Sequence, residues 1–182
     1  MRTIEAIPQN ELRIRNQDRA CRVDARLLRR IALNLLSEGP IRKPKSGLPR
    51  YELGVHLVPG LRMARLNFRH LQHSGPTDVI TFDYGPPPGA AGGESWLVGD
   101  IFICPEVAWR HARQFRTTFQ SELVRYLVHG LLHLRGYDDL DAISRGVMKR
   151  EENRLAKKVG RRFAVDEVAR FLPSSATDRE VE

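Results

Sequence analysis

The feature that most constrains this 182-residue chain is the segment HGLLHLRGYDD, which ends a long apolar stretch. The stretch predicts a helix over residues 118–135, and Gly136 follows it at a position where glycine commonly ends helices. His129 and His133 are four residues apart, so their side chains lie on one face of that helix, one turn apart. Two imidazoles at this spacing can bind one zinc ion. The sequence therefore predicts a metal site near the end of this helix.

A third ligand can come from the loop after the glycine. Asp138 and Asp139 are the carboxylates there, and a carboxylate oxygen is a suitable zinc ligand. Three protein ligands leave a fourth position for water, and zinc lowers the pKa of bound water to about 7. The segment is therefore typical of a hydrolytic metal site, although core histidines followed by acids that cap a turn are the alternative.

The spacing also overlays that of the extended zinc proteases, in which the residue after the first histidine is a glutamate general base. Here that residue is Gly130. A small metallopeptidase would lack its base at the expected place, so it is the less favoured hydrolase.

The chain carries a net charge of +8, with 30 Lys and Arg against 22 Asp and Glu. A basic surface attracts polyanions through long-range attraction and counterion release, so RNA is a better candidate partner than a small neutral molecule. Arg62, Arg65 and Arg69 have helical spacing and would form one basic stripe along a phosphate backbone, with a solvated helix face as the alternative. Further basic residues gather in 42–50 and 149–162.

No apolar run approaches the roughly 18–20 residues that a membrane span needs. Residues 1–15 contain no apolar segment of the kind found in secretory signals, and two cysteines are too few for a disulfide framework. We therefore expect a cytoplasmic protein with no membrane partner, and its oligomeric state stays open.

Hydrophobic periodicity predicts both strands and helices. The predicted strands are residues 11–16, 51–58, 78–82 (a buried strand) and 96–104. Helices are predicted between the cap Asp24 and Gly39, over 59–71, 105–115 and 118–135, between the cap Asp141 and Gly160, and near 165–171. The helix over 118–135 is expected to start with a capping box formed by Thr117 and Gln120. Loops are expected at 40–50 and 85–93.

The elements do not alternate strictly, so the predicted class is α+β with a small mixed sheet of about four strands and five or six helices. One domain is expected over residues 1–172, followed by a frayed tail at 173–182.

The central segment closely resembles the signature H-G-x-L-H-L-x-G-Y-D-H of the YbeY family of endoribonucleases, the bacterial rRNA maturation factors. PTDVITF at residues 76–82 resembles the family's P-T-D-V-L-S-F block, and GDIFI at 99–103 resembles its G-D-I-x-I strand. The similarity covers roughly residues 11–160, and the histidine segment is its most specific part.

The resemblance implies a zinc site at one end of a cleft, with one ion per chain, and a basic groove for RNA. It implies single-strand endoribonuclease activity in 16S rRNA 3′-end maturation and ribosome quality control, with the small ribosomal subunit as partner. His129 and His133 would be ligands and catalytic residues, together with Asp139, which stands where the family usually has a third histidine. An added negative charge there can shift the preference from zinc towards harder divalent ions.

A second departure is Leu71, which stands where the family's L-N-x-x-[YF]-R pattern has an arginine. Arg69 is two positions earlier, about 200° round a helix, so it is a poor substitute. With the change at Asp139, this keeps open a non-catalytic ribosome assembly factor with a structural metal.

Glu122 and Asp138 are candidates for supporting the ligands, with packing and turn capping as the alternatives. No residue is an evident general base, and Glu151 and Asp138 are the only candidates. We expect His111 in the core, and the remaining histidines on the surface or in a groove: His56, His70 and His73.

Overall fold

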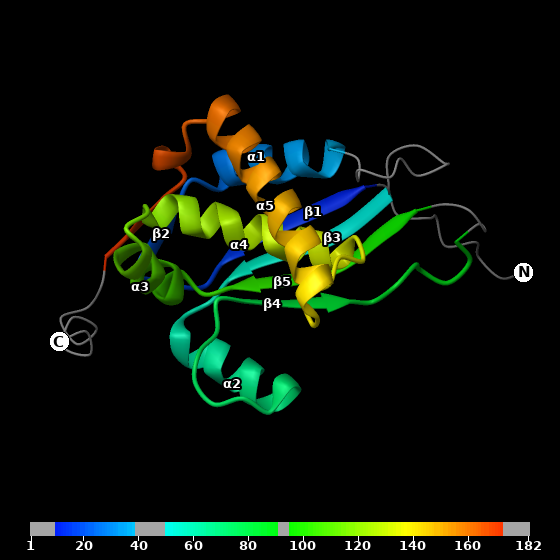
Figure 1. Cartoon of the computed structure of the whole chain (residues 1–182), viewed down its shortest axis with the longest axis horizontal. Helices are drawn as coiled ribbons and strands as arrows, with labels where there is room; N and C mark the ends of the chain where they lie inside the picture. Colours follow the sequence, from blue (N-terminus) through cyan, green and yellow to red (C-terminus); the bar gives the residue numbers. More distant parts are fainter. Residues whose placement is uncertain (1–9, 39–49, 91–94, 173–182) are drawn as a thin grey trace, which may run out of the picture.

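The computed structural model describes residues 10–38, 50–90 and 95–172. The tail expected at 173–182, most of the loop at 40–50 and part of the loop at 85–93 lie outside the described residues. The described chain is α+β, with its main helices packed on a mixed sheet (Figure 1). None of its described helices combines the length and apolarity needed to cross a bilayer.

The main sheet has four strands in the order β1-β3-β5-β4, which confirms the predicted small mixed sheet. The strands are β1 (Glu11–Asn16), β3 (Arg50–Leu57), β5 (Trp96–Ile103) and β4 (Val79–Asp83). β1, β3 and β5 are parallel, and β4 joins the edge of β5 in the antiparallel sense. Because β4 is an edge strand, it is less buried than predicted, and Ile80 is its one fully buried residue.

A second, two-stranded sheet pairs β2 (Cys21–Val23) with β6 (Ala169–Phe171). The sequence did not predict β2, and the helix predicted near 165–171 is wrong except for a single 3-10 turn, η1 (Val165–Glu167). Strands of three residues carry too little periodicity to be recognised, and these two are stabilised by pairing between distant parts of the chain.

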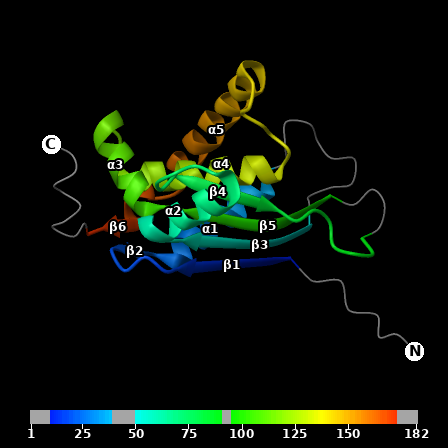
Figure 2. The same ribbon diagram turned by 90° about the horizontal axis from the view of Figure 1, so that it is seen from below.

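Five α-helices complete the fold: α1 (Ala25–Ser37), α2 (Gly60–Leu71), α3 (Pro105–Phe115), α4 (Phe119–Leu134) and α5 (Ala142–Arg162). α1, α4 and α5 lie on one side of the main sheet (Figure 2), and their apolar stripes form the large core with it. α2 packs Met63 and Leu66 against Phe82 and Phe102 in a smaller cluster. Phe102 alternates with the core residue Ile101 along β5, so α2 covers part of the opposite face.

Two helix boundaries differ from the prediction. The capping box of α4 uses Thr118 and Ser121 rather than Thr117 and Gln120. α5 starts at its predicted cap, Asp141, but continues past Gly160. A glycine inside a helix costs only about 1 kcal/mol, so the packing of the buried stripe of α5 overrides it.

Gly130 sets how closely α4 approaches the sheet. A Cβ on this residue would lie 2.6 Å from Cγ2 of Ile101 and 3.1 Å from Oγ1 of Thr81. The residue after His129 therefore faces the sheet, where a larger side chain would have no room.

Candidate metal centre

His129 and His133 occupy the last two turns of α4, and Asp139 lies in the loop between α4 and α5. Gly136 adopts a left-handed φ of 79° after the helix, which lets the loop return towards the two rings. The Nε2 atoms of the histidines are 3.0 Å apart. Asp139 places Oδ2 3.8 Å from Nε2 of His129 and Oδ1 4.0 Å from Nε2 of His133. Within the described ranges, this is the only group of three or more His, Cys, Asp or Glu residues close enough to share an ion.

The hydrogen bonds behind the two rings fix which nitrogen faces the site. Nδ1 of His129 lies 3.1 Å from Oε2 of Glu152, and Nδ1 of His133 lies 3.1 Å from the carbonyl oxygen of Tyr137. A carbonyl and an ionised carboxylate can only accept, so each Nδ1 carries a proton and Nε2 of each ring faces the site. Two bare nitrogen lone pairs would repel at 3.0 Å, so the two Nε2 atoms must share a cation, either one proton in a hydrogen bond or a metal ion.

The donor set fits zinc. Two nitrogens bound to one tetrahedral zinc ion lie roughly 3.3 Å apart, close to the separation observed here. Burial, and then the charge of His129, lower the pKa of His133 below its ordinary value, which keeps this ring neutral and able to bind a metal. The carboxylate supplies the oxygen ligand on the open side of the pair.

Glu152, on α5, is the support that sequence reasoning missed. Burial raises the pKa of its carboxyl group, but hydrogen bonds from His129 and Arg125 and the charge of Lys149 outweigh burial and lower the pKa to about 2. The Nη1 atom of Arg125 lies 2.5 Å from its Oε1, and Nζ of Lys149 lies 3.2 Å from the same oxygen. Glu152 therefore stays ionised and orients His129, as carboxylates commonly do behind metal-binding histidines.

The acid of α5 that the sequence singled out, as a candidate general base, was the neighbouring Glu151. That side chain is buried and makes two hydrogen bonds to Arg154, and it does not line the cleft. Helical spacing could have identified Glu152 from the sequence. Residues 145, 149, 152 and 153 are polar and share one face of α5, and all of them line the cleft.

The other predicted support residues lie near the centre in different ways. Oδ1 of Asp138 accepts hydrogen bonds from the backbone N–H groups of Asp139 and Leu140, so it holds the turn. Glu122 is buried one to two turns before His129 and accepts a hydrogen bond from the hydroxyl of Thr117 at 2.7 Å.

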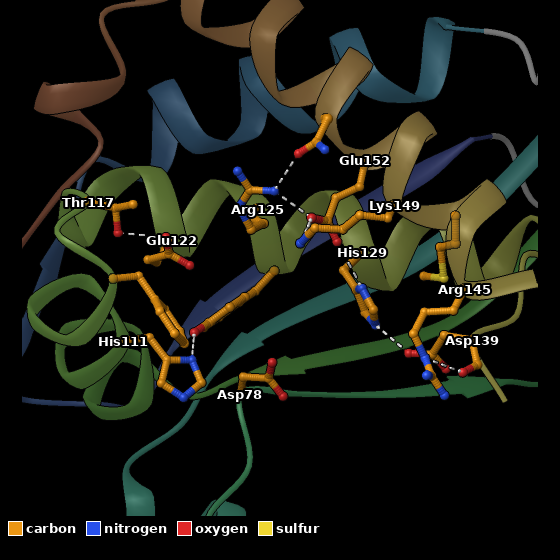
Figure 3. A pocket seen from close by; sticks show the side chains of 14 residues that line it. Asp78, His111, Thr117, Glu122, Arg125, His129, Asp139, Arg145, Lys149 and Glu152 are labelled. Carbon is orange, nitrogen blue, oxygen red and sulfur yellow. Dashed lines mark hydrogen bonds and ion pairs between the residues drawn. The ribbon is translucent and has the colours of Figure 1, made fainter. Parts of the chain in front are cut away.

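The centre opens into a cleft of about 540 Å³ (Figure 3). Its described lining comes from α3, α4, α5, the loops beside them and the residue before β4. Arg125, Arg145 and Lys149 bring positive charge to the side near the histidines. Arg62, Arg65 and Arg69 are exposed on α2 and do not line this cleft.

Two of the remaining histidines have partners that their sequence spacing did not reveal. His111 lines the cleft and its Nδ1 lies 2.6 Å from the hydroxyl of Tyr126. His56 lies on the other face of the sheet with Nε2 2.6 Å from Oδ1 of Asp100.

Fold and site together define an α+β protein with a candidate His-His-Asp metal centre in a cleft edged by cations. The family model described as Endoribonuclease YbeY matches residues 13–160. The chain is 37% identical over 148 residues to Endoribonuclease YbeY of Chlorobium luteolum, covering 80% of this chain and 96% of that protein. It is 46% identical over 95 residues to Endoribonuclease YbeY of Salinispora tropica, covering 48% of this chain and 60% of that one. This chain therefore belongs to the YbeY family of endoribonucleases.

A solution structure of TM1509 from Thermotoga maritima aligns with a TM-score of 0.49 at 24% identity, covering 82% of this chain and 89% of that one.

Proposed function

We propose that this protein is a metal-dependent, single-strand-specific endoribonuclease that acts in the cytoplasm in 16S rRNA 3′-end maturation and ribosome quality control. Its partners would be RNA and the small ribosomal subunit. The observation that carries the metal-dependent step is the pair of Nε2 atoms converging at 3.0 Å beside a carboxylate. His129, His133 and Asp139 are the proposed ligands and the catalytic centre, with one zinc ion per chain.

A bound divalent ion would supply Lewis acidity towards a phosphodiester oxygen and a lower pKa for water at the site. The chain's own residues do the rest. Glu152 and the Tyr137 carbonyl hold the two rings in place, and Asp138 holds the turn that carries Asp139. Glu122 would support α4 through its hydrogen bond with Thr117. Arg145 and Lys149 line the same cleft and would bind the phosphates on either side of the cut bond.

Arg62, Arg65 and Arg69 lie outside the cleft, and we propose that they bind the RNA strand after it leaves the site. Contacts of this kind are to phosphates and carry no sequence preference. Replacing all three by glutamine is expected to weaken RNA binding and flatten its salt dependence, with no change in metal content.

Cleavage of a labelled single-stranded RNA by the purified protein tests the proposed function. We expect cleavage that a chelator abolishes and added zinc restores, and that is lost in His133→Ala. His73→Ala removes an exposed histidine and is the matched control, expected to cut at the normal rate. Cleavage that survives both the chelator and His133→Ala would place the activity elsewhere.

The same preparation separates the two alternatives. An assembly factor with a structural metal would bind the small ribosomal subunit and would not cut RNA, whichever divalent ion is added. A metallopeptidase would digest casein in a zinc-dependent manner.

A further inference from the structure

The cleft does not stop at the candidate metal centre. It extends along α4 to an inner end with Asp78 and His111 (Figure 3), which Phe115 and Tyr126 also line, because both contact His111. The proposed ligands use only the other end, so this inner end needs a separate explanation. Its size is compatible with an organic group, because the whole cleft of about 540 Å³ falls within the range of small-molecule sites.

The hydrogen bond between Tyr126 and His111 bears on which ring nitrogen of His111 donates and which accepts. Burial, and then the charges of Asp78 and Glu122, raise the pKa of Tyr126, so its hydroxyl keeps its proton. A hydroxyl that keeps its proton can donate it to Nδ1 of His111, which lies 2.6 Å away. The half-buried ring then carries its own proton on Nε2 and offers the cleft a donor.

Asp78 offers the cleft a hydrogen-bond acceptor. Its Oδ1 accepts hydrogen bonds from the hydroxyl of Thr77 and the backbone N–H of Val79, both at 2.9 Å. Oδ2 makes no hydrogen bond among the described residues, so it remains an acceptor on a side chain that lines the cleft. The inner end therefore presents a donor and an acceptor from two different elements.

Phe115 adds an aromatic surface. It is the last residue of α3, 58% of its surface is exposed, and its ring makes an edge contact with His111 at a centroid separation of 5.3 Å. Exposed aromatic rings beside hydrogen-bonding groups are the usual platform for unstacked bases of single-stranded RNA.

Charge excludes a phosphate from the inner end. Asp78 and Glu122 are acidic, whereas Arg145 and Lys149 lie at the metal end (Figure 3). A nucleotide would therefore place its phosphate at the metal end and its base at the inner end.

We propose that the inner end of the cleft binds one nucleobase of the RNA, with Phe115 as the stacking surface, and that Asp78 and His111 make guanine the preferred base. This rests on the proposed function. Guanine offers two neighbouring N–H donors to the remaining oxygen of Asp78, beside a carbonyl that can accept from His111. Uracil offers one donor between two carbonyls, one of which would face the carboxylate, so uracil is the least favoured base.

Binding of guanosine and uridine monophosphates to the zinc-loaded protein tests this, because it needs no cleavage. NMR titration is expected to give shifts at His111 and Phe115, with guanosine monophosphate binding at least fivefold more tightly. Phe115→Leu keeps an apolar side chain but removes the ring, and is expected to weaken guanosine monophosphate binding about 5- to 100-fold. Phe68→Leu, at a 63% exposed phenylalanine on α2 outside the cleft, is the matched control.

Asp78→Asn tests the base preference. Asparagine keeps Oδ1 for Thr77 and Val79 but turns the remaining oxygen into a donor, so the fold is preserved and guanine loses its advantage over uracil. Equal binding of the two nucleotides by the unmodified protein, or shifts confined to the metal end, would overturn the proposal even if RNA is cut. Guanosine-selective binding without RNA cleavage would leave the base site standing and remove the proposed function instead.

Discussion

Each face of the main sheet carries a histidine bonded to a carboxylate, but the two pairs have different surroundings. On the helical face, Nδ1 of His129 lies 3.1 Å from Glu152. On the opposite face, Nε2 of His56 lies 2.6 Å from Asp100, a pair that fits because a Cβ at Gly54 would lie 1.9 Å from Oδ1 of Asp100.

The difference lies in the second nitrogen of each ring. In His129 that nitrogen meets Nε2 of His133 and the carboxylate of Asp139. In His56 it is Nδ1, which is buried without a hydrogen-bond partner among the residues that the structure describes, and the ring stacks on Phe102 at 4.6 Å. Of these two histidine–carboxylate pairs, the one at His129 is therefore the candidate for a metal site, because the ring's other nitrogen converges with further donors.

The strongest way to test this comparison is His129→Ala. It removes one of two converging nitrogens and leaves Glu152 without its ring, so zinc affinity is expected to fall roughly 1000-fold or more. Competition against a fluorescent zinc chelator measures it. Zinc binding that persists at the original affinity would mean that the ion binds elsewhere.

Glu152→Gln should have the next largest effect. Glutamine can occupy the same space but holds His129 without a charge, so zinc affinity is expected to fall about 10- to 100-fold. Glu151→Gln is the matched control, because it neutralises the adjacent acid, which is paired with Arg154 outside the cleft. An equal loss in both variants would show that α5 responds to charge in general and that Glu152 has no particular role.

The sequence predicts the parts of the site that lie close together along the chain. His129, His133 and Asp139 lie within eleven residues, so helical periodicity and one glycine turn placed Asp138 and Asp139 near the two rings, and the family resemblance chose Asp139. Glu152 comes from the next helix, and its contact with His129 depends on how α5 crosses α4, which no local pattern encodes.

The pairing of His56 with Asp100 is invisible in sequence for the same reason, because it follows from the register of β3 against β5. The four main strands and five helices were predicted because each carries its own periodicity, whereas the short β2–β6 pair was not.

Asp139→His tests the contribution of the third proposed ligand. Replacing the carboxylate by an imidazole removes one negative charge and a hard oxygen donor, so the ratio of zinc to manganese affinity is expected to rise several-fold. The same chelator competition, run with both metals, measures that ratio. A ratio that does not change would show that Asp139 does not contact the ion.

His56→Leu should change metal binding least. The leucine keeps apolar contact with Phe102, and among the described residues it leaves Asp100 with the hydroxyl of Tyr84, at 2.8 Å, as its side-chain hydrogen-bond partner. The free energy of unfolding is expected to fall by about 1–2 kcal/mol in urea titrations, while zinc affinity stays the same. This variant removes the histidine–carboxylate pair on the face of the sheet opposite the candidate metal centre. Weaker zinc binding would therefore mean that the two faces are coupled through the sheet. The convergence of donors at His129 would then not fully explain why zinc binds on one face.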